Sequence, residues 1–99
     1  AVEYINANRW RSKLCTDLRN FIRNYDVVIV PSFAGNQLAM TNLTGHPIVC
    51  MPSGFNKNGS PVSITLVGNL YDEATILAIA KAFQDKTEHH KKHPPLFAD

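Results

Sequence analysis

The sequence predicts a small α/β domain in which a mixed β-sheet of about three strands is packed by two main helices. Helical patterns of apolar residues lie near both ends of the chain, and three short segments rich in β-branched residues lie between them. Proline or glycine closes each of these segments. A chain of 99 residues, of which 44% are hydrophobic, is long enough for one folded domain covering 1–99 and too short for two.

The first helix is expected over residues 2–25. Its larger apolar residues recur at three- and four-residue spacing, so they share one face that we expect to be buried. These residues are Leu14, Leu18, Phe21, Ile22 and Tyr25. Asn6 and Asn8 are weak helix formers, so the sequence leaves room for a break near Ala7.

Two expected strands, residues 27–30 and 48–51, are apolar runs without alternation, which is typical of strands covered on both faces. Each is followed by a proline, which cannot donate to a β-ladder. A third strand over residues 62–67 alternates apolar and polar residues, and we expect it to form an antiparallel hairpin with 48–51 through a loop longer than two residues. Residues 38–43 are expected to form a short helical turn closed by Gly45 and Pro47.

The second main helix is expected to begin at Asp72, whose carboxylate can cap the amides of the first turn. Ile76, Leu77, Ala80 and Phe83 form its expected buried stripe. The helix is expected to end in the basic segment that precedes Pro94 and Pro95.

Four motifs occur in one order along the chain. They are DVVIVP at 26–31, NLTGHP at 42–47, IVCMPSGF at 48–55 and GSPVSITLVG at 59–68. This order resembles the carboxy-terminal end of amidase-signature enzymes, and the resemblance continues through the helix at Asp72 to His90 and Pro94. It implies the carboxy-terminal part of the amidase-signature fold and a fragment of a larger amidase.

The resemblance also implies a function for the parent protein, namely hydrolysis of a carbon–nitrogen amide bond through an acyl-serine. The Ser–Ser–Lys machinery of that family is absent from this chain, so we expect no catalytic residue here and no activity of the chain alone. One alternative is a segment of a glutamyl- or aspartyl-tRNA amidotransferase A subunit, and another is a non-catalytic interaction module. In those A subunits the insert after the first strand is longer and carries an acidic residue. The present chain has no Asp or Glu between Pro31 and Pro47, which favours a general amidase.

The loop at residues 32–41 contains the candidate substrate-binding residues Phe33, Asn36 and Gln37, because in the family such loops wall the substrate pocket. A Ser53–Lys57 dyad is rejected, since both residues fall in a turn without a nucleophile motif. A metal site at His89, His90 and His93 is rejected in favour of a solvated basic helix end. No metal or other cofactor is expected.

Cys15 and Cys50 are expected to be reduced, packed thiols, which is typical of a cytoplasmic protein. The expected partners are the remainder of the parent amidase and, in the full enzyme, a small amide substrate. Direct nucleic-acid binding is not expected from a net charge of +2, and no apolar run is long enough to span a membrane. Apolar strands that need packing partners on both faces would leave apolar surface and strand edges exposed in this chain, so we expect the isolated chain to self-associate.

Overall fold

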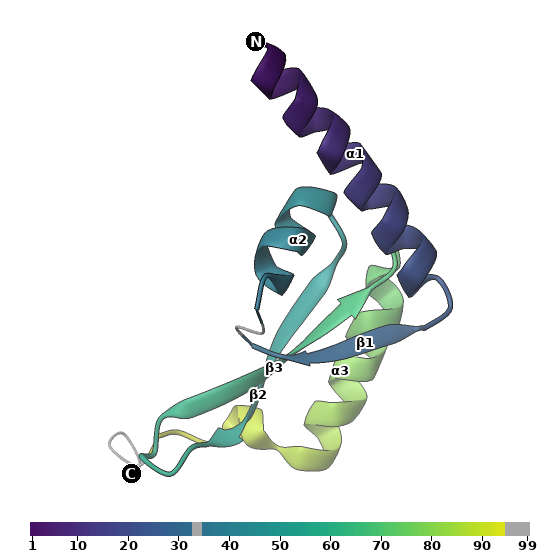
Figure 1. Cartoon of the computed structure of the whole chain (residues 1–99). Helices are drawn as coiled ribbons and strands as arrows, with labels where there is room; N and C mark the ends of the chain where they lie inside the picture. Colours follow the sequence, from purple (N-terminus) through teal and green to yellow (C-terminus); the bar gives the residue numbers. More distant parts are fainter. Residues whose placement is uncertain (33–34, 95–99) are drawn as a thin grey trace.

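The computed structural model describes residues 1–32 and 35–94. The expected α/β class is confirmed, with three strands and two long helices (Figure 1). The elements in chain order are α1 (Val2–Ile22), β1 (Val27–Pro31), α2 (Gln37–Thr44), β2 (Ile48–Phe55), β3 (Pro61–Gly68), α3 (Glu73–Thr87) and a short 3-10 helix η1 (His89–Lys91).

The three strands form one sheet in the order β1-β3-β2. Both pairings are antiparallel, whereas the sequence led us to expect a mixed sheet. The β2–β3 hairpin is confirmed, with a loop of more than two residues in which the Asn56 side chain accepts hydrogen bonds from the amides of Asn58 and Ser60. The expected end of β2 at Met51 is wrong, because a bulge between Pro52 and Gly54 lets this edge strand continue to Phe55.

One face of the sheet packs against α3 and forms the apolar core. Met51, Leu66 and Ala80 are buried at its centre, with Val27, Val49, Ile64, Ile79 and Phe83 partly buried around them. A Cβ added to Gly68 would lie 2.5 Å from Ile76 Cγ2, so α3 approaches the end of β3 more closely than any other residue type would allow.

The position of α3 corrects two expectations. Leu77 was expected in the buried stripe, but it is 58% exposed, while Ile76 and Ala80 are buried. The helix turns Leu77 away from the sheet because Ile76, Ile79 and Ala80 already span the contact. Asp72 occupies the N-cap position as expected, but its carboxylate accepts a hydrogen bond from the Thr75 hydroxyl at 2.7 Å and, within the described residues, caps no backbone amide.

Helix α1 is continuous from Val2 to Ile22, so the break considered near Ala7 does not occur. Its amino-terminal half projects away from the other elements (Figure 1). Leu18 and Ile22 are buried as expected, whereas Phe21 and Tyr25 are exposed and lie against each other with ring centroids 5.7 Å apart. The expected buried face is therefore confirmed at Leu18 and Ile22 and wrong at Phe21 and Tyr25.

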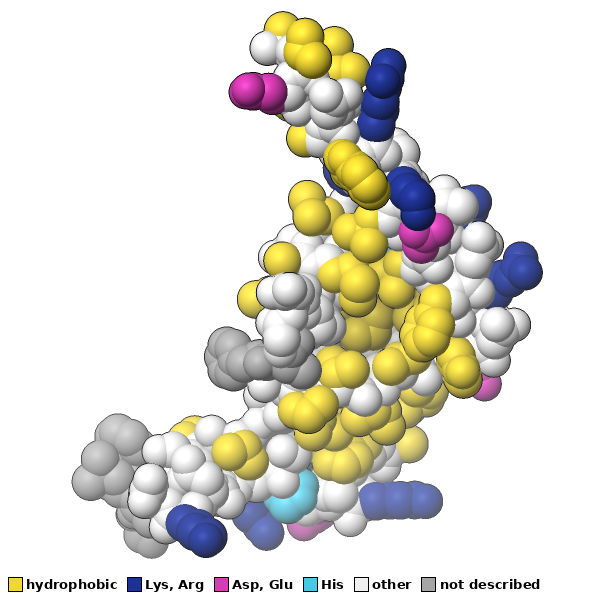
Figure 2. All heavy atoms as spheres, viewed as in Figure 1, with side chains coloured by type: hydrophobic (Ala, Val, Ile, Leu, Met, Phe, Trp, Pro, Cys, Tyr) yellow, Lys and Arg dark blue, Asp and Glu magenta, His cyan; other side chains and the backbone are white. Residues whose placement is uncertain are grey.

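The expectation that the first two strands are covered on both faces is wrong for this chain. Ile29 points to the same side of the sheet as Leu66, but it is 61% exposed because α3 lies over β2 and β3 and leaves β1 uncovered. Cys50 on β2 is exposed as well. Figure 2 shows apolar side chains gathered over the middle of one face of the molecule.

The carboxy-terminal end of α3 also differs from the expected basic helix end. The helix stops at Thr87, and Glu88 adopts a left-handed conformation with φ of 57°. His89 then starts η1, which packs on β2, and its ring lies 6.2 Å from that of Phe83. The pairing of His89 and His93 on one helix face therefore does not arise.

Candidate functional site

Two of the three candidate substrate-binding residues lie at the beginning of α2. Asn36 is the N-cap residue and is exposed, and Gln37 is the first helical residue and is half-buried. Phe33 lies outside the described residues. The helix ends at Gly45, whose φ of 79° gives the left-handed C-cap expected from the sequence.

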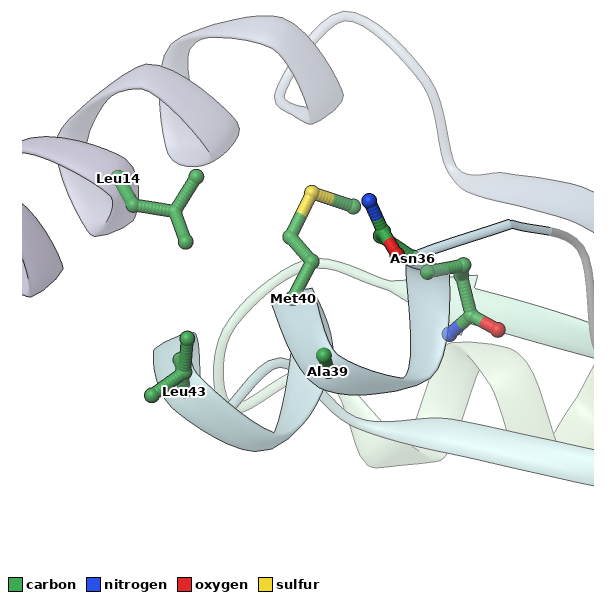
Figure 3. Close-up of a pocket in the computed structure, with 6 residues that line it drawn as sticks. Leu14, Asn36, Ala39, Met40 and Leu43 are labelled. Atoms are coloured by element: carbon green, nitrogen blue, oxygen red, sulfur yellow. The ribbon is translucent and has the colours of Figure 1, made fainter.

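Asn36 and Gln37 line a hollow of about 550 Å³ between α1 and α2, which we call the α1–α2 hollow (Figure 3). Its other lining residues are Leu14, Ala39, Met40 and Leu43. Leu14 extends from α1 and Met40 from α2 into the same space, while Asn36 adds its carboxamide at one end. The hollow is thus apolar with polar groups at one edge, as is common for small-molecule sites.

A second space lies on the other side of α2, between this helix and the sheet. This hydroxyl cavity has a volume of about 140 Å³. It is lined by Ser32, Gln37, Leu38, Ile48, Cys50, Ser63 and Thr65. Gln37 therefore lines both spaces, and it is the one sequence-predicted site residue of the described chain that does so.

The strand register places the polar residues of this cavity together. Cys50 and Val30 lie opposite Thr65 on either side of β3, and Ser63 is two residues away on the same face. Ser32 follows directly after β1 and completes the group. Its Oγ lies 2.7 Å from Ser63 Oγ, 3.2 Å from Thr65 Oγ1 and 3.5 Å from Cys50 Sγ.

These hydroxyl groups surround the Cys50 thiol and form hydrogen bonds with it. Cys50 Sγ lies 3.4 Å from Ser63 Oγ. Hydrogen bonds from Ser32 and then Ser63 to the thiolate lower the pKa of Cys50 below its usual value, and the smaller effect of burial opposes them. Both cysteines are free, in line with the expected reduced thiols. The expectation that both are packed is wrong for Cys50, because the edge strand β2 leaves its side chain exposed.

His46 is a further buried polar residue near α2, and no sequence motif assigned it a role in a site. It follows Gly45, is only 4% exposed, and its Nδ1 lies 2.8 Å from Thr44 Oγ1. Its Nε2 has no hydrogen-bond partner among the described residues. Burial without a compensating charge lowers the pKa of His46 below 6.5.

The described part of the chain also bears on a metal site, on a Ser53–Lys57 pair and on a membrane-spanning helix. Residues 1–32 and 35–94 contain no group of three His, Cys, Asp or Glu side chains that could hold a metal ion. Ser53 is half-buried on β2 beside the bulge, while Lys57 is exposed in the following loop. Each helix in these same ranges is too short or too polar to cross a membrane.

The alternation along β3 is the sequence signal that could have located part of the hydroxyl cavity. Ser63 and Thr65 alternate with apolar residues on this strand, so they had to share one face. The predicted hairpin would have placed Cys50 on the neighbouring strand. Ser32 could not be added from sequence, because the pairing of β1 with β3 joins segments more than thirty residues apart.

Comparisons with known proteins support the resemblance seen in the motifs. No protein-family model matches the chain. The chain is 30% identical over 112 residues to the A subunit of the glutamyl-tRNA(Gln) amidotransferase of Oceanobacillus iheyensis. It is 32% identical over 112 residues to proteins of the same name from strains of Bacillus cereus and Bacillus anthracis.

Each of these matches covers 94% of this chain and 23% of the relative, so the chain spans about a quarter of the length of these relatives. The matched stretch of 112 residues exceeds the 99 residues of this chain, so the relatives contain residues without a counterpart here. The similarity confirms, over nearly the whole chain, the resemblance to the carboxy-terminal segment of amidase-signature proteins.

Proposed function

We propose that this chain is the carboxy-terminal segment of an amidase-signature hydrolase that cleaves a carbon–nitrogen amide bond through an acyl-serine. The observation that carries the proposal is the similarity over 94% of the chain to one segment of amidotransferase A subunits. The nucleophile and the bases would come from the remainder of the parent protein. This segment would supply part of the sheet and, through α2, a wall of the substrate pocket.

The position of Asn36 and Gln37 supports their proposed role as substrate-binding residues. Both line the α1–α2 hollow, whose apolar floor suits the carbon skeleton of a small amide. Their carboxamides offer hydrogen-bond donors and acceptors without a charge. Phe33 is retained in the proposal as a third residue of the same loop.

The second candidate function is that of a segment of a tRNA-dependent amidotransferase A subunit. The names of the relatives favour it. The sequence between Pro31 and Pro47 favours the hydrolase, because it offers no carboxylate for the amine of a glutamine. We therefore keep the hydrolase as the first proposal.

The remainder of the parent protein is also the partner that we propose for the exposed apolar surface. Ile29, Phe21 and Trp10 are exposed on β1 and α1. Such surfaces are costly in contact with water and mark interaction sites.

In the isolated chain, we propose that the same exposed apolar residues cause self-association. Light scattering over a dilution series measures this, and a monomer at high concentration would contradict it. A cytoplasmic location, expected from the two unpaired cysteines, belongs to the same proposal.

The coding sequence upstream of Ala1 tests the proposed function. We expect an open reading frame that continues upstream and encodes a Gly/Ser-rich segment with the Ser–Ser–Lys residues. The encoded protein should hydrolyse simple aliphatic or aromatic amides, and alanine at the nucleophilic serine should abolish the activity. A reading frame without these residues would exclude the hydrolase. Release of ammonia from glutamine alone, without hydrolysis of other amides, would favour the amidotransferase.

The 99-residue chain by itself should show no amide hydrolysis, because it offers neither nucleophile nor oxyanion-binding groups of that family. The assay compares the purified chain with its Ser53→Ala variant on the same amides. Turnover by the chain that the variant lacks would mean that Ser53 is a nucleophile and that the division of labour proposed above is wrong.

A further inference from the structure

We propose that two copies of this chain associate through the outer edge of β1, so that their two three-stranded sheets join into one continuous sheet. The two β1 strands run antiparallel, and Ile29 lies opposite Ile29 of the second copy. The inference rests on the self-association proposed above for the isolated chain, to which it adds the surface and the register. It does not depend on the hydrolase.

β1 is an edge strand, and no described strand pairs with its outer side. The Gly68 amide donates to the Pro47 carbonyl at 2.9 Å, so the backbone groups of Gly68 point toward β2. Gly68 lies opposite Val27, whose own N–H and C=O therefore point outward from the sheet. The pattern repeats at every second residue, so the backbone groups of Ile29 and Pro31 also point outward. Pro31 agrees with this register, because it has no N–H to donate to β3.

This edge is complementary to a second copy of itself when a two-fold axis passes through Ile29. Ile29 then exchanges N–H···O=C bonds in both directions with Ile29 of the second copy. The Val27 N–H of each copy donates to the Pro31 carbonyl of the other, so every outward N–H of the strand is used. Asp26, the charged residue that precedes the strand, comes opposite Ser32, so no like charges meet.

The distribution of apolar surface favours this edge over that of β2. Ile29 points to the α3 face and is 61% exposed, so the pairing would bury two isoleucine side chains against each other. On the same face of β2, Met51 is already only 2% exposed, and pairing there would bury little more. A bulge between Pro52 and Gly54 also interrupts β2, and η1 packs on that strand.

A charge swap at residue 29 tests the register. Ile29→Lys and Ile29→Glu should each raise the dissociation constant of the dimer by about tenfold or more, because two like charges would lie opposite each other. An equal mixture of the two variants should associate again, because a lysine then faces a glutamate. Sedimentation equilibrium over a dilution series measures all three samples. The series must extend to high concentration, since a pairing of five residues from each copy buries a small interface.

Leu77→Lys is the matched control for an added charge on an exposed apolar residue. Leu77 is 58% exposed, close to the value for Ile29, but it lies on α3 and not at the edge of the sheet. This variant should associate as the unaltered chain does. Recovery of association in the mixture also shows that both residue-29 variants are folded.

Cross-linking gives a second readout. Residues that exchange hydrogen bonds across antiparallel strands have Cα atoms about 5.5 Å apart, a separation that a disulfide can span. Ile29→Cys, in a chain whose native cysteines are replaced by serine, should therefore form a covalent dimer when diamide is added as oxidant. Val28→Cys in the same background should not, because Val28 comes opposite Val30 of the second copy.

Association of either charged variant with the affinity of the unaltered chain, or no association of their mixture, would overturn the proposal. Weakened association of Leu77→Lys would overturn it in favour of non-specific apolar contact, and a disulfide-linked dimer of the unaltered chain through Cys50 would assign the contact to the β2 edge. Each of these results leaves the proposed self-association standing. An unaltered chain that is monomeric at every concentration would overturn both, and neither result affects the reading-frame test of the hydrolase.

Discussion

The two faces of the sheet are built by the same three strands, yet they have different properties. On the α3 face, Leu66 and Met51 close against Ala80 to form a continuous apolar core. On the α2 face, Thr65 and Cys50 contribute to a polar group beside two open spaces. The period of two along β3 separates these roles, because neighbouring residues of one strand point to opposite faces. The apolar core cluster thus lies on the α3 face, whereas the opposite face combines the buried Val67 with a polar group.

The strongest test of this division is Ile76→Ala on the α3 face. Ile76 is 1% exposed and lies against the end of β3, so we expect a loss of about 2–5 kcal/mol in the free energy of unfolding. Leu77→Ala is the matched control, because this neighbour is 58% exposed and should cost far less. Urea melts measure both. Similar losses for the two variants would mean that α3 packs on another face in solution.

Gly68→Ala tests the packing of α3 against the sheet by a change at the end of β3. The added Cβ would meet Ile76 Cγ2 at 2.5 Å, so α3 or the end of β3 must shift, and we expect a loss of about 1–3 kcal/mol. The double variant Gly68→Ala with Ile76→Ala should lose less than the sum of the single losses, because the smaller side chain gives room for the new methyl. Full additivity in urea melts would show that the close approach of α3 does not cause the loss.

Most of the α3 face could be predicted from the sequence, and most of the α2 face could not. Ile76, Ala80 and the alternation in β3 follow directly from periodicity. Leu77 was misplaced because a helix of this composition has apolar residues on more than one side, and only the sheet selects among them. The cluster around Ser32 depends on a β1–β3 pairing between distant segments, which local pattern does not specify. Of the candidate site, the sequence therefore located Gln37 beside the cavity but none of its hydroxyl groups.

His46, the buried residue between α2 and β2, is expected to make the stability of the fold depend on pH. Its pKa is lowered in the folded chain from 6.5, so the unfolded chain binds the proton more tightly. Its contribution to stability is therefore fully present above pH 6.5 and is lost as the pH falls toward the lower folded pKa. We expect His46→Gln to reduce the fall in melting temperature between neutral and mildly acidic buffer. His90→Gln is the control on an exposed histidine. An identical fall in wild type and His46→Gln would show that the imidazole is not buried in neutral form.

The smallest expected loss of stability is at the start of α3, where Asp72→Ala removes a side-chain hydrogen bond and no core packing. The carboxylate binds the Thr75 hydroxyl and, in the described structure, no backbone amide, so we expect a loss of about 0.5 kcal/mol in place of the roughly 1 kcal/mol typical of a backbone cap. Asp72→Asn is the matched control, because it keeps an oxygen acceptor for Thr75 and removes the charge near the helix amino terminus. Urea melts at low and high salt separate the two contributions, since only the charge effect is screened. A loss of about 1 kcal/mol or more in Asp72→Ala, with Thr75→Val nearly silent, would indicate that the side chain caps the backbone in solution.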